Sequence, residues 1–456
     1  MRLTTTTTMT KQVVPLSSSA ITRWSMGKLC EHSRLTRDVA ESLVWDVRNR
    51  LLRQETVLES IRAVIANVDG EEQYGFPRLS SRRPTDAVRS KNKTEKTTKG
   101  IIRATNVDVS IGWRESLEKE RNRQQVLPQV SKSLRNLWVL HQDTRRLTEE
   151  LLVDENGASA SNFWHKFASN NESVKQSGPQ QTIVAGAMEQ IRSRHASTVE
   201  TMADVLLLLR GAFDSSETDQ FEALLESFLR GRLGVQLLCD HYVKLHRYRR
   251  PGVTQDCSLA DVLDDAVTES KHICDAHYEI SPDVLVLDKR LATTAKVTLV
   301  RPWVHHALCE ILKNAMAATI DHHERQHGSV SIDSSLLPPI EVSLSGVDDH
   351  ADAVTISVKD RGMGLKGLSS TAEAFKFASS SVAKRWDRLD EQQSYAMVRS
   401  PLQSLGVGLS TSQWMMQHFG GDVQLSNNND LTNGEADGCT ASVLLCKDPT
   451  ILERAP

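Results

Sequence analysis

The chain of 456 residues is long enough for more than one hydrophobic core, because single domains typically hold about 50–200 residues. Charged residues make up 25% of it, and the formal net charge is -3. This balance excludes a strongly basic nucleic-acid-binding protein and a highly charged disordered chain. No apolar run approaches the ~20 residues that span a bilayer. We therefore expect two domains, no nucleic-acid partner and no membrane partner.

The N-terminal stretch, residues 1–34, has the composition of a targeting segment. Its first 29 residues carry four basic residues, a threonine run and a serine run, and no acidic residue precedes Glu31. Such a composition is typical of mitochondrial transit peptides. We expect residues 1–34 to be a transit peptide, with a disordered tail as the alternative.

Residues 35–250 are dominated by helical periodicity of apolar residues. Polar, Pro- and Gly-containing residues 69–110 interrupt the pattern, which predicts a loop or disordered insertion. The expected helices cover residues 36–68, 116–153 with a bend at Pro128, 181–213 and 218–248. Four consecutive amphipathic helices predict a four-helix bundle.

From residue 253 to 448 the pattern changes to strands that alternate with helices, which predicts an α/β sandwich domain and the overall class α + α/β. Helices are expected over residues 259–277 and 303–323. Strands are expected over residues 284–287, 296–300, 340–344, 354–359, 422–425 and 441–445.

The first motif of this domain is the helix HHALCEILKNAMAAT, residues 305–319. His306, Glu310 and Asn314 are four residues apart and therefore share one face of the helix. A carboxylate and a carboxamide one turn apart offer oxygens to Mg²⁺ and a base to a nucleophile. The alternative is a solvated polar stripe.

The second motif, DRGMGL, follows a predicted strand. The carboxylate of Asp360 can accept a hydrogen bond from an exocyclic amine such as that of adenine, while Gly362 and Gly364 allow the backbone to approach a flat ring. The alternative is an ordinary turn.

The third motif, SLGVGL, opens a helix with Gly406, Gly408 and Leu409. Free N–H groups at a helix N-terminus stabilise phosphates. The segment lacks the Lys-Ser/Thr of a P-loop and the spacing of a dinucleotide fingerprint.

In this order, ExxKNA, DxGxG and GxGL resemble the nucleotide-binding boxes of the GHKL superfamily, which contains gyrase B, heat-shock chaperones, histidine kinases and MutL proteins. Residues 305–319 look most like the mitochondrial 2-oxo-acid dehydrogenase kinases, which act on the pyruvate or the branched-chain complex. Residues 228–241, FLRGRLGVQLLCDH, also resemble a segment of that family. The resemblance covers roughly residues 181–448, and residues 36–153 match only in helical character.

The resemblance implies an ATP-binding domain of the histidine-kinase type that uses ATP and Mg²⁺. Glu310 would activate a substrate serine, His306 would tune it, and Asn314 would hold the metal. The remaining residues implied to contact nucleotide are Asp360, Gly362 and Gly364 at adenine, Gly406, Gly408 and Leu409 at the phosphates, and Thr440 at the adenine side. Residues 366–405 would form the ATP lid. Lys313 is either a further candidate or a surface charge on the helix.

The resemblance further implies a serine kinase of the mitochondrial matrix that inhibits a dehydrogenase complex by phosphorylating its E1α subunit. The lipoyl domain of E2 would be a partner, and the kinase would be a homodimer. Two departures stand out: Ala317 replaces a family arginine, and the C-terminus lacks the family's Asp-Trp motif. The alternatives are a non-catalytic ATP-binding scaffold and a histidine kinase.

Overall fold

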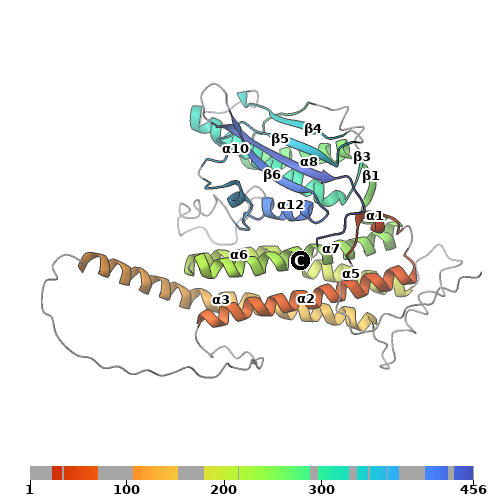
Figure 1. Cartoon of the computed structure of the whole chain (residues 1–456), viewed down its shortest axis with the longest axis horizontal. Helices are drawn as coiled ribbons and strands as arrows, with labels where there is room; N and C mark the ends of the chain where they lie inside the picture. The colour runs from red at the N-terminus through yellow and green to blue at the C-terminus, as the bar shows by residue number, and fades with distance from the viewer. Residues whose placement is uncertain are drawn as a thin grey trace, which may run out of the picture.

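The computed structural model contains a layer of long helices and, stacked on it, a layer formed by a sheet and shorter helices (Figure 1). The structure describes residues 23–32, 35–69, 106–152, 179–213, 215–287, 296–327, 336–347, 350–366, 368–378, 406–429 and 436–454. The protein is therefore mostly helical with a mixed sheet in its C-terminal part, as the sequence predicted.

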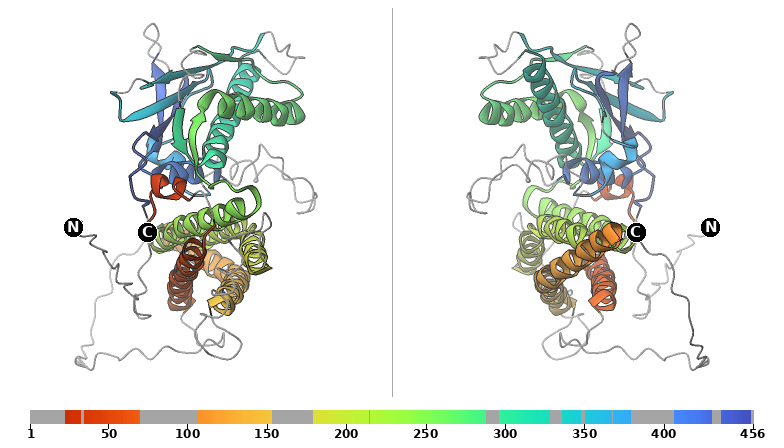
Figure 2. Two further views of the ribbon diagram at one scale, coloured as in Figure 1. Left: turned by 90° about the vertical axis from the view of Figure 1, so that its right-hand side faces the viewer. Right: turned by 90° about the vertical axis from the view of Figure 1, so that its left-hand side faces the viewer.

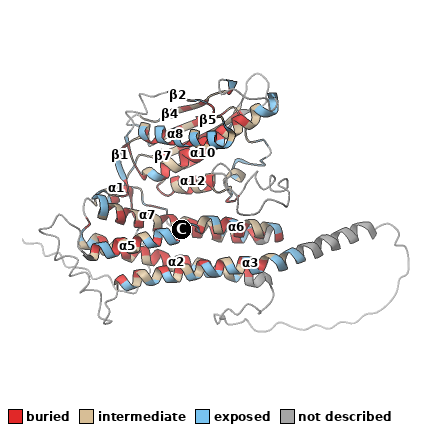
Figure 3. Cartoon of the chain, turned by 180° about the vertical axis from the view of Figure 1, so that it is seen from behind, coloured by how far each residue is buried: buried red, intermediate tan, exposed pale blue. Residues whose placement is uncertain are grey.

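Five long helices build the helical layer. They are α2 (Arg37–Asp69), α3 (Asn106–Leu152), α5 (Pro179–Arg194), α6 (Thr198–Ala212) and α7 (Ser215–Tyr248). Helix α2 packs against α3 and α7, α5 packs against α7, and α6 packs against α3. Apolar residues at helical spacing, such as Leu43, Val47 and Leu51, are fully buried between them. Figure 3 shows the buried residues gathered on the inward sides of these helices.

The helix boundaries correct the sequence predictions in two places. The predicted third helix is divided into α5 and α6 by a turn around His195. Helix α3 begins at Asn106, inside the predicted insertion of residues 69–110, and continues through Pro128. Proline removes a single backbone donor, and the long amphipathic face on either side of it keeps the helix packed. Residues 70–105 lie outside the described residues.

The upper layer contains a five-stranded sheet in the order β2-β4-β5-β7-β6 and a two-stranded sheet, β1-β3. Strands β2 and β4 are parallel, and all other neighbours are antiparallel. The strands are β1 (Thr254–Ser258), β2 (Val284–Val286), β3 (Lys296–Leu299), β4 (Ile340–Ser345), β5 (Ala353–Lys359), β6 (Asp422–Asn429) and β7 (Ala436–Cys446). The sequence predicted all of these except β1, which is short and mostly polar and carries no apolar alternation.

Three helices accompany the sheet: α8 (Leu259–Tyr278), α10 (Arg301–His327) and α12 (Gly408–Gln417). Helix α10 packs on β5 and β7, α12 packs on β6 and β7, and both α8 and α12 pack on α10. Figure 2 shows α8 and α10 on one side of the sheet. A short 3₁₀ helix, η3 (Thr371–Phe375), contacts α12.

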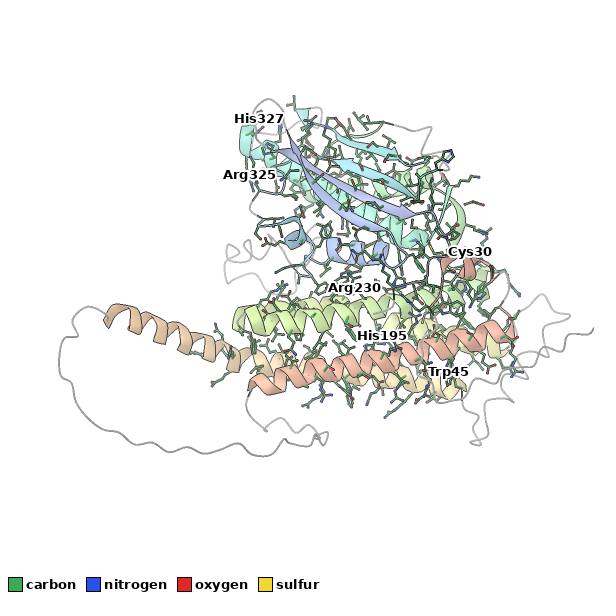
Figure 4. All side chains as sticks on the ribbon, in the orientation of Figure 1. Cys30, Trp45, His195, Arg230, Arg325 and His327 are labelled. Carbon is green, nitrogen blue, oxygen red and sulfur yellow. The ribbon has the colours of Figure 1, made fainter. Side chains whose placement is uncertain are left out.

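Polar contacts join the two layers where α12 faces the long helices (Figures 1 and 4). Arg210 of α6 donates to the carbonyl oxygens of Phe377 at 2.9 Å and Ala378 at 2.7 Å. Arg230 of α7 lies over the Trp414 ring and donates to the Gln417 side chain at 2.9 Å. Helix α12 is therefore held by α7 on one side and by the sheet on the other, while α6 binds the segment that follows η3.

Residues 23–32, the last part of the segment expected to be a transit peptide or a disordered tail, pack against the fold. Trp24 is 3% exposed, helix α1 (Met26–Cys30) follows it, and Ser25 pairs with Leu452 near the C-terminus. The Gly27 N–H also donates to the Pro449 carbonyl at 2.7 Å.

A buried charge cluster, here called the terminal clasp, ties both chain ends to the two layers. It consists of Trp24, Asp46, Arg50, His418 and Glu453. The Glu453 carboxylate accepts from Trp24 N at 3.0 Å, from Arg50 Nη1 at 3.1 Å and from His418 Nε2 at 2.8 Å. Trp24 Nε1 donates to Asp46 at 2.7 Å, and Asp46 also accepts from Arg50. A buried carboxylate persists in its charged form only with partners of this kind.

The position of Gly234 and the pKa of Glu453 both reflect how closely the clasp is packed. A Cβ atom on Gly234 of α7 would lie 2.1 Å from Arg50 Nη1, so the guanidinium uses the space that this glycine leaves. Burial by itself would raise the pKa of Glu453. The hydrogen bond from His418 and the charge of Arg50 outweigh burial and lower the pKa to about 2.

The structure predicts that loss of the Glu453 charge destabilises the fold. Removing one partner of a buried ion pair costs about 3–5 kcal/mol. Because glutamine keeps some of the hydrogen bonds, we expect E453Q to lower the free energy of unfolding by about 3 kcal/mol, measured by urea unfolding at pH 7. The matched control is D143N, which removes the exposed pair with Arg146 and should change stability by less than about 0.5 kcal/mol. Equal unfolding midpoints for E453Q and wild type would contradict this role of the clasp.

The effect of E453Q on stability should also depend on pH. Since the folded-state pKa of Glu453 is depressed from its ordinary value of 4.5, its stabilisation is complete above that value and is lost as the pH falls toward 2. The stability difference between wild type and E453Q should therefore shrink between about pH 5 and pH 2.

Candidate active site

Helix α10 places its polar residues in three different environments. Glu310 and Lys313 are each 8% exposed, His306 is half-buried, and Asn314 is exposed. The helix forms because apolar residues such as Leu308 and Ile311 pack between the sheet and α8. Of the three polar residues predicted to share one face of α10, Glu310 is buried more deeply than His306 and Asn314.

The Glu310 carboxylate is held on two sides. Lys313 Nζ donates to Glu310 Oε1 at 2.5 Å. On the other side, a Cβ atom on Gly408 would lie 2.1 Å from Glu310 Oε2. Gly408 is therefore the residue that lets α12 begin directly against this carboxylate. Lys313 is buried, so the alternative prediction that it is a surface charge is wrong.

His306 lies one turn before Glu310 and has no hydrogen-bond partner for its buried Nε2 among the described residues. Burial lowers the pKa of His306, while the charge of Glu310 acts in the opposite direction. A neutral imidazole beside a carboxylate can accept or relay a proton at that nitrogen.

Asp360 follows β5 directly and is 7% exposed. Its Oδ1 accepts from the backbone N–H of Gly362 at 2.8 Å and of Cys439 at 3.0 Å. These bonds hold the DxG turn against β7. A Cβ atom on Gly438, whose φ is 95°, would lie 2.0 Å from the Asp360 carbonyl oxygen, so only glycine allows this approach.

Thr440 belongs to the same cluster through a residue that sequence reasoning missed. Asn428 of β6 donates to the Asp360 carbonyl at 3.0 Å and accepts from Thr440 Oγ1 at 2.6 Å. No motif marks Asn428 in the run of asparagines 427–429, and only the pairing of β6 with β7 brings it here.

The two halves of the site lie along α10. Gly408 meets this helix at Glu310, and Gly362 meets it at Ala318. These helix positions are eight residues apart, a rise of about 12 Å, and Asn314 lies midway. Helix α12 starts after Val407 without a side-chain cap, which leaves its first N–H groups available to an anion.

The remaining predicted site residues frame the same region. Gly364 and Gly406 both have positive φ, 66° and 71°, a conformation that favours glycine. Leu409 is half-buried in the first turn of α12. Of the predicted lid, residues 379–405 lie outside the described residues.

Comparison with known proteins finds similarity to protein kinases. A family model described as mitochondrial branched-chain alpha-ketoacid dehydrogenase kinase matches residues 117–268. Pyruvate dehydrogenase (acetyl-transferring) kinase isozyme 1, mitochondrial, of Mus musculus is 26% identical over 249 residues, which are 52% of this chain and 53% of that protein. Human kinase isozyme 4 of the same series is 27% identical over 248 residues, 52% of this chain and 56% of that protein.

Over about half its length, the chain is similar to mitochondrial 2-oxo-acid dehydrogenase kinases. It spans about half the length of the curated relatives it matches. Among solved structures, a mycobacterial sensor histidine kinase, MprB, matches at 14% identity with a TM-score of 0.25, covering 44% of this chain and 97% of that chain. That TM-score is too low to carry any argument about the fold.

The contact between Gly362 and α10 yields a stability prediction. In G362A the new Cβ would lie 2.8 Å from Ala318 Cβ and 3.1 Å from the Ala318 backbone, which cannot swing aside. We expect a loss of about 1–3 kcal/mol in unfolding free energy, the usual cost of overpacking. Chemical denaturation of the variant measures this loss.

Gly211 in α6 provides the matched control, because a Cβ atom there meets nothing within 4 Å. G211A should be neutral or stabilise the protein by up to about 1 kcal/mol, as expected for alanine in an exposed helix. If G362A and G211A behave alike, the close approach of the DxG turn to α10 is wrong.

Proposed function

We propose that this chain is an ATP-dependent protein kinase that phosphorylates a serine on the E1α subunit of a pyruvate or branched-chain 2-oxo-acid dehydrogenase complex and so inhibits it. The observation that carries the proposal is the buried Glu310 carboxylate, which lies against Gly408 at the uncapped start of α12. A proton acceptor beside a phosphate-binding helix start is the arrangement that phosphoryl transfer to a hydroxyl requires.

The residues present fit ATP and Mg²⁺. The start of α12 would receive phosphates, with Gly406, Gly408 and Leu409 around it. The exposed Asn314 carboxamide offers an oxygen to Mg²⁺, which prefers oxygen ligands. When bound, ATP supplies the phosphoryl group and Mg²⁺ neutralises its charge.

Adenine would be bound at the opposite end of the site. The Asp360 carboxylate would accept from the adenine amine, and Gly362 and Gly364 leave the ring room to approach. Thr440 would close the adenine side, held in place by its hydrogen bond to Asn428. These groups meet at the end of β5, where Asp360 leaves the sheet.

Glu310 would accept the proton of the substrate serine, and His306 would tune its basicity from one turn away. Lys313 holds the Glu310 carboxylate in place through an ion pair.

The remaining parts of the proposal concern the whole protein. The helical layer would form a four-helix bundle, with α5 and α6 together as its third member, and dock on the lipoyl domain of E2. The kinase would act as a homodimer in the mitochondrial matrix. Residues 253–448 would form the ATP-binding domain, with the lid at residues 366–405. Among the described residues, no helix is both long and apolar enough to cross a membrane.

A histidine kinase is the less favoured candidate, because His195, in the turn between α5 and α6, and His241 of α7 are both buried. His195 is 5% exposed, and burial lowers its pKa to about 4. His241 is fully buried, accepts from Gly252 N at 2.9 Å, and has a pKa lowered by burial to about 3. A phospho-accepting histidine must instead be reachable by the nucleotide.

The central test is the variant E310Q. Glutamine preserves shape but cannot accept the serine proton, so we expect ATP affinity to be retained and the transfer rate to fall by about 10²-fold or more. Transfer to purified E1α is measured at saturating ATP after nucleotide binding has been shown to be equal. E324Q, an exposed acid on the same helix, is the matched control and should transfer at the wild-type rate.

The results of this test distinguish a kinase that uses Glu310 as a base from a non-catalytic scaffold. Transfer by E310Q at the wild-type rate would remove Glu310 from the role of base. If wild type binds ATP but modifies neither the pyruvate nor the branched-chain complex, the non-catalytic scaffold becomes the better account.

Nucleotide recognition is tested at Asp360. D360A removes the proposed acceptor of the adenine amine and should weaken ATP binding by roughly 10- to 100-fold, the equivalent of about 1–3 kcal/mol for an unpaired buried group. D360N is the sharper variant, because its oxygen can still accept from Gly362 and Cys439 while its amide presents a donor to the adenine amine. We expect D360N to unfold like wild type and to lose ATP affinity in calorimetry. Unchanged affinity in both variants would contradict the adenine role.

A further inference from the structure

On the side of α10 that faces α8, the two helices bring three metal-binding side chains together. His305 and Cys309 are one turn apart on α10, and Glu269 lies opposite on α8. His305 Nε2 is 3.5 Å from Glu269 Oε2, and Cys309 Sγ is 3.8 Å from both ring nitrogens of His305. One ligand atom from each of the three residues lies within 4.8 Å of the other two.

These separations are close to those around a tetrahedral metal ion. With zinc bonds of roughly 2.0–2.3 Å, neighbouring ligand atoms lie about 3.3–3.6 Å apart. Small rotations of the exposed Glu269 side chain are enough to bring the ligand atoms to these separations. The donor set of one thiolate, one imidazole and one carboxylate matches zinc, a borderline-soft ion, and not Mg²⁺ or Ca²⁺, which prefer oxygen.

We propose that Glu269, His305 and Cys309 form a binding site for Zn²⁺ that bridges α8 and α10. Three protein ligands leave a fourth position to water, and that position faces solvent because exposure rises from buried Cys309 through His305 to Glu269. An ion can therefore enter without unfolding either helix.

Zinc binding replaces the Cys309 S–H bond by a Zn–S bond and releases the proton to solvent, with no change in oxidation state. Sγ lies 3.8 Å from the Ala266 carbonyl, so the sulfur is fixed at the α8–α10 interface in either form.

Cobalt(II) is the probe for the test, because it occupies zinc sites and a thiolate ligand gives it a charge-transfer absorption in the near ultraviolet. Titrating the full chain with Co²⁺ should give this absorption at one equivalent, and added Zn²⁺ should abolish it. We expect C309S and H305A to lack the absorption and E269Q to bind cobalt about tenfold more weakly or worse. E269Q changes an exposed side chain and so tests the site without disturbing the core.

Two controls exclude other sources of the signal. H323A removes a member of the stacked His323–His327 pair at the far end of α10, which could bind cobalt through nitrogen alone. C274S removes a buried cysteine of α8 that is not a proposed ligand. Both variants should keep the absorption. The proposal is overturned if wild type shows no thiolate absorption, if C309S retains it, or if E269Q and wild type bind cobalt equally.

Discussion

A carboxylate at the end of the chain, on Glu453, receives hydrogen bonds from Trp24 near the other end, from Arg50 of α2 and from His418 just after α12. These groups come from both layers of the molecule. Because an unpaired buried charge costs several kcal/mol, the three elements cannot separate without a large penalty. The clasp therefore sets the position of the helical layer relative to the sheet layer.

Helix α12 connects this constraint to the candidate active site. Its C-terminal end carries His418 of the clasp, and its N-terminal end places Gly408 against Glu310. The helix has ten residues and spans about 15 Å, and packed helices move as rigid units. A shift of the helical layer, through Arg230 or the clasp, would consequently be felt at the start of α12 where phosphates are proposed to bind.

Helix α10 has two chemically different sides, and both follow from where its neighbours lie. Toward α12 it presents Glu310, whose carboxylate is restrained by Lys313. Toward α8 it presents His305 and Cys309, next to Glu269. Consecutive residues on a helix point about 100° apart, so His305 and His306 can belong to separate sites while sharing one backbone.

The sequence by itself determined the long helices, most strands and the positions of the three motifs that are proposed to bind nucleotide, because local periodicity, glycine and strand-end carboxylates act within a few residues. Tertiary structure alone decided the break at His195, the packing of Trp24 into the fold and the place of Asn428 beside Asp360. It also decided that Lys313 is buried with Glu310 and not on the surface. The physical reason is that burial and pairing between distant segments depend on how elements pack, which no local pattern encodes.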